Sequence, residues 1–155
     1  MRLQISTRLA LYAALQLAAD PSKQFAAAEI AERFDISVNH LAKVLRTLGR
    51  AGLVEAVRGA GGGYRFRGNV KRVTLMDVVQ LFEDLGANGR GDDEPGAASE
   101  EGRALRRVLD EIDDIARATL SSITLATMLK LVREGRDART EPPEDRLAGR
   151  VQRSR

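Results

Sequence analysis

The fold is decided by residues 37–68, which read SVNHLAKVLRTLGRAGLVEAVRGAGGGYRFRG. Apolar residues recur in the first half at intervals of three and four, so they share one face of a helix. Ser37 can cap that helix, because its hydroxyl can accept a hydrogen bond from an orphan amide of the first turn. Gly52 can end it in a left-handed conformation. The apolar stripe of this predicted helix consists of Leu41, Val44, Leu45 and Leu48.

The second half of the stretch has the composition of a short hairpin. Residues 54–57 and 64–66 are β-prone runs, and the glycines between them permit positive φ. A capped helix with a polar, partly basic face, followed by a hairpin that carries arginines, predicts a winged helix-turn-helix. In that fold the helix lies in the major groove of DNA, and the hairpin, called the wing, reaches the backbone or the minor groove.

Two helices are predicted before this stretch. Residues 6–20 are rich in Ala and Leu, apolar nearly all round and followed by Pro21, which indicates a helix buried on several sides. Residues 26–35 predict a second, short helix that a tight turn joins to the capped helix. A short helix, a tight turn and a longer capped helix are typical of a helix-turn-helix.

Three further segments follow the hairpin. Residues 75–85 predict a helix that begins after Thr74, with Asp77 at the position of a capping-box acid. Residues 86–99 have the composition of a loop. Residues 134–155 are charged and lack an apolar period, so we expect a disordered tail.

A long helix is predicted to begin after Ser99, and its apolar residues form a regular seam with spacings of 4, 3, 4, 3 and 4. The seam could pack inside the chain or against a second copy. A dimer is favoured, because a small domain has little else to cover a helix about 30 Å long. A last helical piece is predicted over residues 124–132. The predicted dimerisation residues are Leu105, Leu109, Ile112, Ala116 and Ile123, with Thr119 also in the seam and Val108 and Ile115 at its edge.

The composition limits the class of protein. The chain has 155 residues, of which 43% are hydrophobic and 4% aromatic, which fits one small domain with an extension and an aliphatic core. It has no cysteine, so disulfides, thiolate metal sites and a cysteine nucleophile are excluded. No apolar run approaches the roughly 20 residues that span a bilayer, and we find no secretion signal. We therefore expect a cytoplasmic protein that does not associate with membranes.

The net charge of +3 hides an asymmetry along the chain. Residues 1–72 contain 12 Lys/Arg and 5 Asp/Glu, a net charge of +7. Residues 73–133 contain 7 Lys/Arg and 12 Asp/Glu, a net charge of −5. Residues 134–155 contain 6 Lys/Arg and 5 Asp/Glu, a net charge of +1. A basic first half suggests a polyanionic partner, although an ordinary solvated surface is the alternative interpretation.

The glycine-rich segment does not meet the requirements of a nucleotide-binding loop. Counting from Gly59, Tyr64 stands where a dinucleotide fingerprint needs its third glycine. Asn69 follows Gly68 where a P-loop needs lysine. Because the chain also lacks a recognisable nucleophile–base pair or set of metal ligands, we do not expect an enzyme.

The predicted fold is mainly α, a winged helix-turn-helix DNA-binding domain with a long C-terminal dimerisation helix. We divide the chain into three parts. Residues 1–73 form the DNA-binding domain, residues 74–133 contain a linker helix, a loop and the dimerisation helix, and residues 134–155 form the charged tail.

With these motifs, the chain resembles the Rrf-two family of bacterial winged-helix regulators over about residues 1–133. The wing is the most specific part of the resemblance, and the pair Asn39-His40 is most similar to the family's nitric-oxide-responsive branch. The matching stretches are residues 30–34, 36–37, 39–45, 48–54, 57–64, 77–79 and 122–126.

The resemblance implies a homodimer that binds an inverted repeat in double-stranded promoter DNA. Residues at the start of the recognition helix would lie at the major groove, where Val38 could touch a thymine methyl. Arg58 would approach the minor groove from the wing. The residues expected to contact DNA are Ser37, Val38, Asn39, His40, Lys43, Arg46, Arg58, Gly59, Tyr64 and Arg65.

The sequence differs from the family in the residues that would bind an iron–sulfur cluster. Cluster-binding members hold an iron–sulfur centre with three cysteines before the long helix, and the corresponding region here, residues 88–102, has none. Where some members supply an acidic ligand near the N-terminus, this chain has Arg8, and its only histidine, His40, lies in the recognition helix. Thiolates are the usual cluster ligands, so we expect no iron–sulfur cluster, no other metal and no cofactor.

We therefore expect a sequence-specific transcriptional regulator, more specifically a repressor, that binds an inverted-repeat operator as a homodimer. One alternative is a regulator of the same fold gated by a small-molecule effector or a protein partner at the 86–99 loop. The other is a winged-helix module used only for protein interaction.

Overall fold

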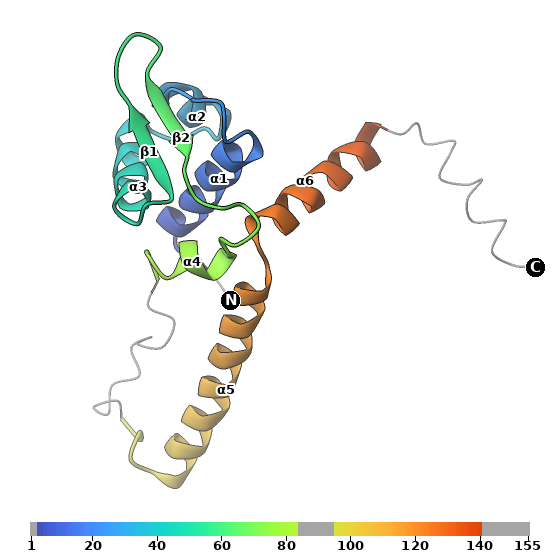
Figure 1. The fold of residues 1–155 in the computed structure, drawn as a ribbon. Helices are drawn as coiled ribbons and strands as arrows, with labels where there is room; N and C mark the ends of the chain where they lie inside the picture. Colours follow the sequence, from blue (N-terminus) through green and yellow to red (C-terminus); the bar gives the residue numbers. More distant parts are fainter. Residues whose placement is uncertain (1–2, 84–94, 141–155) are drawn as a thin grey trace, which may run out of the picture.

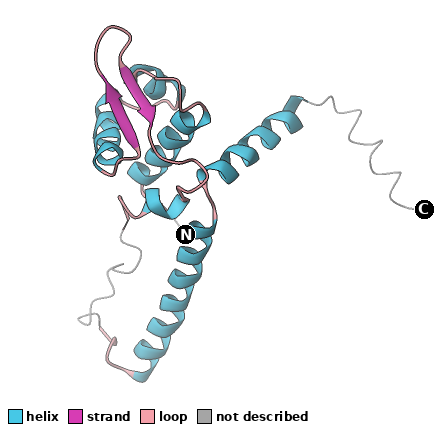
Figure 2. Cartoon of the chain, viewed as in Figure 1, coloured by secondary structure: helices cyan, strands magenta, loops and turns pink. Residues whose placement is uncertain are grey.

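The computed structural model of the protein describes residues 3–83 and 95–140 (Figure 1). Helices dominate, and the described strands form one two-stranded sheet (Figure 2). The elements in order are α1 (Ile5–Ala19), α2 (Ala27–Arg33), α3 (Val38–Arg50), β1 (Val54–Val57), β2 (Gly63–Phe66), α4 (Leu75–Val79), α5 (Glu100–Ser122) and α6 (Leu125–Thr140). The elements from α1 to α4 pack into one body, which we call the head, and α5 projects away from it (Figure 1).

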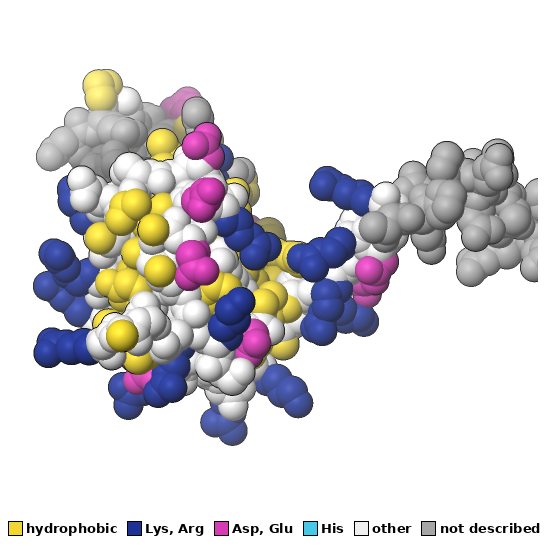
Figure 3. Space-filling view, turned by 90° about the horizontal axis from the view of Figure 1, so that it is seen from above, with side chains coloured by type: hydrophobic (Ala, Val, Ile, Leu, Met, Phe, Trp, Pro, Cys, Tyr) yellow, Lys and Arg dark blue, Asp and Glu magenta, His cyan; other side chains and the backbone are white. Residues whose placement is uncertain are grey.

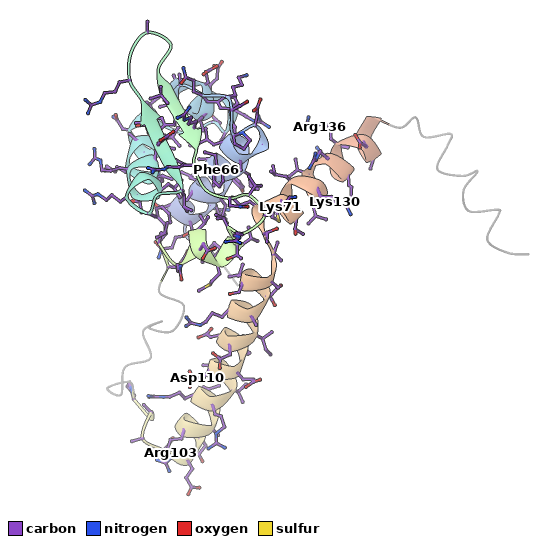
Figure 4. The ribbon with its side chains drawn as sticks, in the orientation of Figure 1. Phe66, Lys71, Arg103, Asp110, Lys130 and Arg136 are labelled. Atoms are coloured by element: carbon purple, nitrogen blue, oxygen red, sulfur yellow. The ribbon has the colours of Figure 1, made fainter. Side chains whose placement is uncertain are left out.

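The core of the head is built around α1. Its small residues Ala10, Ala13 and Ala14 are completely buried, as is Leu17. Small side chains allow other elements to approach closely, and α1 contacts α3, α4, β2 and α6. Phe66 of β2 is buried in the same core (Figure 4). The nearly all-apolar character of the first predicted helix is therefore explained by neighbours on several sides.

The wing is anchored to the segment between α1 and α2. β1 and β2 pair antiparallel, with Val54 opposite Phe66 and Val57 opposite Gly63. Phe25 pairs with the outer side of β2, because its N–H donates to the Tyr64 carbonyl at 2.9 Å and its carbonyl accepts from Tyr64 N–H at 2.8 Å. A Cβ on Gly63 would overlap the Phe25 carbonyl, so this close approach requires glycine.

The C-terminal helices are tied to the head by main-chain hydrogen bonds. Leu75 N–H donates to the Ile123 carbonyl at 2.8 Å, and Leu125 N–H donates to the Val73 carbonyl at 2.9 Å. Leu125 is also completely buried in the core. The start of α5 is separated from the head, but its end is fixed to it.

Most predicted elements of the head are confirmed. Gly52 has a φ of +73°, as the helix end after α3 was expected to require. Thr74 caps α4, since its hydroxyl accepts from Asp77 N–H at 3.2 Å, and Asp77 Oδ2 accepts from Thr74 N–H at 2.8 Å. None of the described helices combines the length and the apolar character needed to cross a bilayer.

The predicted helix over residues 75–85 is wrong in its length. α4 ends at Val79, and residues 80–83 follow as a tighter turn in which Leu81 N–H and Phe82 N–H donate to carbonyls three residues back. Glu83 turns towards α1, with its carboxylate 2.6 Å from Gln4 N and from Thr7 Oγ1. Long-range hydrogen bonds of Glu83 therefore follow the end of α4, and residues 84–85 of the predicted helix lie outside the described residues.

The predicted tail begins too early. Residues 134–140 are helical, because α6 continues to Thr140, and Lys130 and Glu134 form an i,i+4 ion pair on its surface. The single Gly135 does not break the helix. Residues 141–155, and the part of the predicted loop from 86 to 94, lie outside the described residues.

Replacing Gly63 with alanine is expected to lower the free energy of unfolding by about 1–3 kcal/mol, the usual cost of forcing extra volume into a packed site. Chemical denaturation followed by circular dichroism measures the change. The matched control is Gly135→Ala, where an added Cβ meets no atom within 4 Å. A Gly63→Ala protein as stable as wild type would contradict the close pairing of Phe25 with the wing.

Candidate nucleic-acid interface

α3 has one buried face and one exposed face. The Ser37 hydroxyl accepts from His40 N–H at 3.1 Å and so caps the start of the helix, as predicted. All four residues of the predicted apolar stripe are buried: Leu41, Val44, Leu45 and Leu48. The opposite face is solvent-exposed and carries Asn39, Lys43, Arg46 and Arg50. The helix therefore presents a polar surface that takes no part in the core.

Five of the residues predicted to contact DNA lie exposed along the first nine residues of α3 and at its N-cap. They are Ser37, Val38, Asn39, Lys43 and Arg46. Val38 is a large apolar residue that is nevertheless 47% exposed. An exposed valine among polar side chains is suited to contact a thymine methyl.

His40 lies differently from the rest of the predicted set. It is half-buried, and its Nε2 lies 3.2 Å from Ser6 Oγ of α1. The imidazole thus turns towards the start of α1 instead of standing on the exposed face. The sequence reasoning missed Ser6, because no local motif links two residues that are 34 positions apart.

A hollow of about 580 Å³ lies on the surface where the start of α1 meets α3. It is lined by Ser6, Ser37, Asn39, His40, Lys43, Val44, Thr47 and Phe82. Hydroxyl, amide, imidazole and ammonium groups therefore converge beside the exposed face of α3. Among residues 3–83 and 95–140, none that lines the hollow has a carboxylate.

The first turn of α1, which supplies Ser6 to this hollow, is fixed by Glu83. The carboxylate of Glu83 accepts hydrogen bonds from Gln4 N–H and the Thr7 hydroxyl, both at 2.6 Å. Thr7 is completely buried, so its hydroxyl needs this acceptor. The sequence offered no signal for this contact, whose partners are 76 positions apart.

Arg58 is exposed at the tip of the wing. Arg58 and Gly59 are exposed at the start of the wing tip, and within the described residues Arg58 makes no ion pair or side-chain hydrogen bond. Gly59 and Gly61 have φ of +107° and +74°, which permits the tight tip. The Gln24 side chain donates to the Gly61 carbonyl at 2.5 Å and holds the tip against the segment before α2.

Two predicted wing contacts have structural partners of their own. Arg65 pairs with Glu55 on the neighbouring strand. Tyr64 is half-buried, packs against the core and pairs through its main chain with Phe25. Both residues therefore support the wing, and their contact with DNA stays a prediction.

Basic side chains dominate the surface around α3 and the wing. Figure 3 looks down on the wing, and most charged side chains at the edge of the head in this view are Lys or Arg. Arg103 and Asp110 lie far along α5, away from this surface (Figure 4).

In the segment between α1 and α2, the hydrogen bond from the Ser22 hydroxyl lowers the pKa of the Asp20 carboxyl below its usual range.

α5 has an uncovered apolar stripe. Its members are Leu105, Val108, Ile112 and Ile115, which are 60%, 57%, 54% and 58% exposed. Leu109 and Ala116 of the predicted seam are half-buried. Ile123 was wrongly placed in the helical seam, because it lies beyond the end of α5 in an extended conformation and packs against the core. Its part in a dimer stays a prediction. The uncovered stripe is therefore shifted towards the residues predicted at the edge of the seam.

Comparisons with known proteins connect these features to a family. The model of the Rrf2 family, described as iron-dependent transcriptional regulators, matches residues 3–131. The HTH-type transcriptional regulator BadM of Rhodopseudomonas palustris is 56% identical over 135 residues, which cover 85% of this chain and 83% of BadM. The HTH-type transcriptional regulator NsrR of Bacillus subtilis is 39% identical over 85 residues, which cover 54% of this chain and 58% of NsrR.

Solved structures show the same fold. CymR, the global cysteine regulator of B. subtilis, has a TM-score of 0.71 at 24% identity and covers 84% of this chain and 98% of its own. At that identity the likeness shows the fold alone. IscR of T. potens has a TM-score of 0.65 at 27% identity, covering 87% of this chain and 90% of its own.

Replacing Ser37 with alanine is expected to lower the free energy of unfolding by about 1 kcal/mol, because the first turn of α3 loses its side-chain cap. Thermal and urea denaturation in the absence of DNA measure this effect separately from any DNA contact. Ser121→Ala, at an exposed position near the end of α5, is the matched control. Equal loss in both variants would contradict a capping role for Ser37.

Proposed function

Because the chain belongs to the Rrf2 family of DNA-binding transcriptional regulators, we propose that it is a cytoplasmic repressor that binds an inverted-repeat operator as a homodimer, without an iron–sulfur cluster. One observation carries this proposal. The buried stripe of α3 leaves its polar face exposed beside an arginine-bearing wing. This surface has the shape and charge of a reader of the major groove flanked by a contact to the backbone.

The exposed side chains divide into two roles. Lys43 and Arg46 of α3 and Arg58 of the wing are cations suited to phosphate, and such contacts supply position and much of the affinity. Ser37 and Asn39 have hydrogen-bonding groups suited to base edges, which supply specificity. The sequence preference is therefore assigned to the first turn of α3.

The homodimer is supported by the stripe on α5. Four large apolar side chains in a row, each more than half exposed, are costly to leave in water on a small protein. A second copy covers them with the same stripe, as a two-fold interface requires. Two heads related by a two-fold axis match an operator made of two inverted half-sites.

The residues present do not fit an iron–sulfur cluster. The chain has no cysteine, so no thiolate is available for a cluster. Its single histidine is engaged with Ser6 beside the recognition helix. We therefore assign no step of regulation to iron, although the description of the family model names it. Repression follows from occupancy, because a bound dimer covers promoter DNA that polymerase needs.

The proposal is tested by selecting genomic fragments with the purified protein. Metal-free buffer, competitor DNA and about 150 mM salt are used, because DNA affinity depends steeply on salt. Recovery of fragments that share an inverted repeat is expected. Recovery of random sequence alone would overturn the proposal and favour a winged-helix module for protein interaction or a regulator that needs an effector.

The double variant Val108→Asp with Ile112→Asp is expected to be a folded monomer that binds the operator weakly, because it places two charges in the uncovered stripe. Light scattering would give the chain mass of 16.9 kDa instead of twice that value. The control, Ser121→Asp, places a charge at an exposed position on the side of α5 opposite the stripe. A dimeric Val108→Asp, Ile112→Asp protein would exclude the stripe as the interface.

Arg58→Ala is expected to weaken operator binding and to reduce the slope of log affinity against log salt by about 0.9 for each wing, the contribution of one phosphate contact, and hence by about 1.8 for the homodimer. Fluorescence anisotropy at several salt concentrations measures both quantities. Arg107→Ala removes an exposed arginine from α5 and should leave the slope unchanged. Wild-type affinity and slope in the Arg58 variant would place the wing outside the interface.

A further inference from the structure

We propose that the hollow between the start of α1 and α3 holds one backbone phosphate of each operator half-site, bound by Ser6 and Lys43, with His40 orienting the Ser6 hydroxyl. This inference rests on the proposed function and deepens it. It makes the first turn of α1 a third contact element, beside the recognition helix and the wing. It also assigns His40 to the support of a backbone contact and not to a base edge.

The chemistry of the lining fits an anion that only accepts hydrogen bonds. Lys43 supplies a cation, and Ser6 supplies a hydroxyl donor that lies within hydrogen-bond distance of His40. The Thr47 hydroxyl is already engaged, since it donates to the Lys43 carbonyl at 3.3 Å. Because none of the described lining residues carries a carboxylate, a phosphate oxygen in the hollow meets donors without a competing negative charge from this part of the chain.

Ser6 and His40 are paired in a way that can direct a proton to the anion. Their side chains approach to 3.2 Å, between Ser6 Oγ and His40 Nε2. When the protonated Nε2 donates to Ser6 Oγ, the hydroxyl hydrogen of Ser6 is free to donate to a phosphate oxygen. The two side chains then act as one donor unit, polarised in the same direction.

The position of Ser6 is set by its neighbours in α1. Gln4 and Thr7, on either side of Ser6 in the chain, both donate to the Glu83 carboxylate at 2.6 Å. These two hydrogen bonds hold the first turn of α1 to the segment after α4. Glu83 does not line the hollow, and its Oε1 is already shared by the two donors.

The hollow also lies where a phosphate is expected. Ser37, Asn39 and Lys43 belong both to its wall and to the exposed surface of α3. A helix in the major groove is flanked by the two phosphate backbones, and helix-turn-helix proteins use a preceding helix to contact one of them. The hollow opens beside the same turn of α3 that is assigned to the groove.

The test is a scan of the selected operator with single neutral methylphosphonates, one position at a time, using the full-length homodimer. Neutralising one phosphate in each half-site is expected to weaken wild-type binding more than Ser6→Ala binding, because the variant has already lost the Ser6 contact and keeps only that of Lys43. On the unmodified operator the Ser6→Ala homodimer should bind about 10- to 100-fold more weakly, because a hydrogen bond worth about 3- to 10-fold is lost in each of the two half-sites. Ser121→Ala serves as the control and should follow wild type throughout the scan.

The inference is overturned if Ser6→Ala responds to every neutralised phosphate as wild type does, while wild type still prefers the operator to random DNA. A wild-type protein without that preference overturns the proposed function and the inference together. Thermal denaturation confirms that the variant is folded, so a loss of affinity is not a loss of structure.

Discussion

The burial of Leu41, Val44, Leu45 and Leu48 fixes which side of α3 faces solvent, and the interface depends on that orientation. Removing a side chain of this size from water contributes about 1.5–3 kcal/mol. Rotation of α3 about its axis would lose several such contributions and would bury Lys43 or Arg46 without a partner, which is costlier still. The polar surface of the helix is thus a consequence of its packing in the head.

The same core positions the other two parts of the proposed DNA complex. The wing is held at a fixed distance from α3, because Phe25 pairs with Tyr64 on one side of β2 and Phe66 is buried on the other. The end of α5 is joined to the head through Leu75 and Ile123. In the proposed dimer, the geometry of the α5 interface therefore sets the separation of the two recognition helices, and with it the spacing of the half-sites.

The features that the sequence predicted well depend on neighbours in the chain. The Ser37 cap and the turn at Gly52 are set within a few residues, so local rules find them. The contact of Glu83 with Thr7 depends on residues far apart in the chain and was not predictable from spacing. The same reason explains why α4 ends early, because the residues after Val79 turn to meet α1.

The residues of the candidate site also fall into those that local sequence patterns predict and those whose position depends on tertiary packing. Exposed residues such as Asn39 and Lys43 follow from the helical period, because they lie opposite a stripe that must be buried. His40 shares that local pattern, yet it turns to Ser6, whose position is known only once α1 and α3 are packed together. Ile123 kept the heptad spacing, but the chain leaves the helix before it to join the core.

The central claim is that two copies of α3 enter the major groove of one operator. Methylation interference on the selected operator tests it directly, because methylated guanine N7 blocks contacts in the major groove. If two recognition helices bind one operator, two groups of interfering guanines are expected on one face of the duplex, about one or two helical turns apart. A single group, or interference confined to adenines methylated in the minor groove, would contradict it.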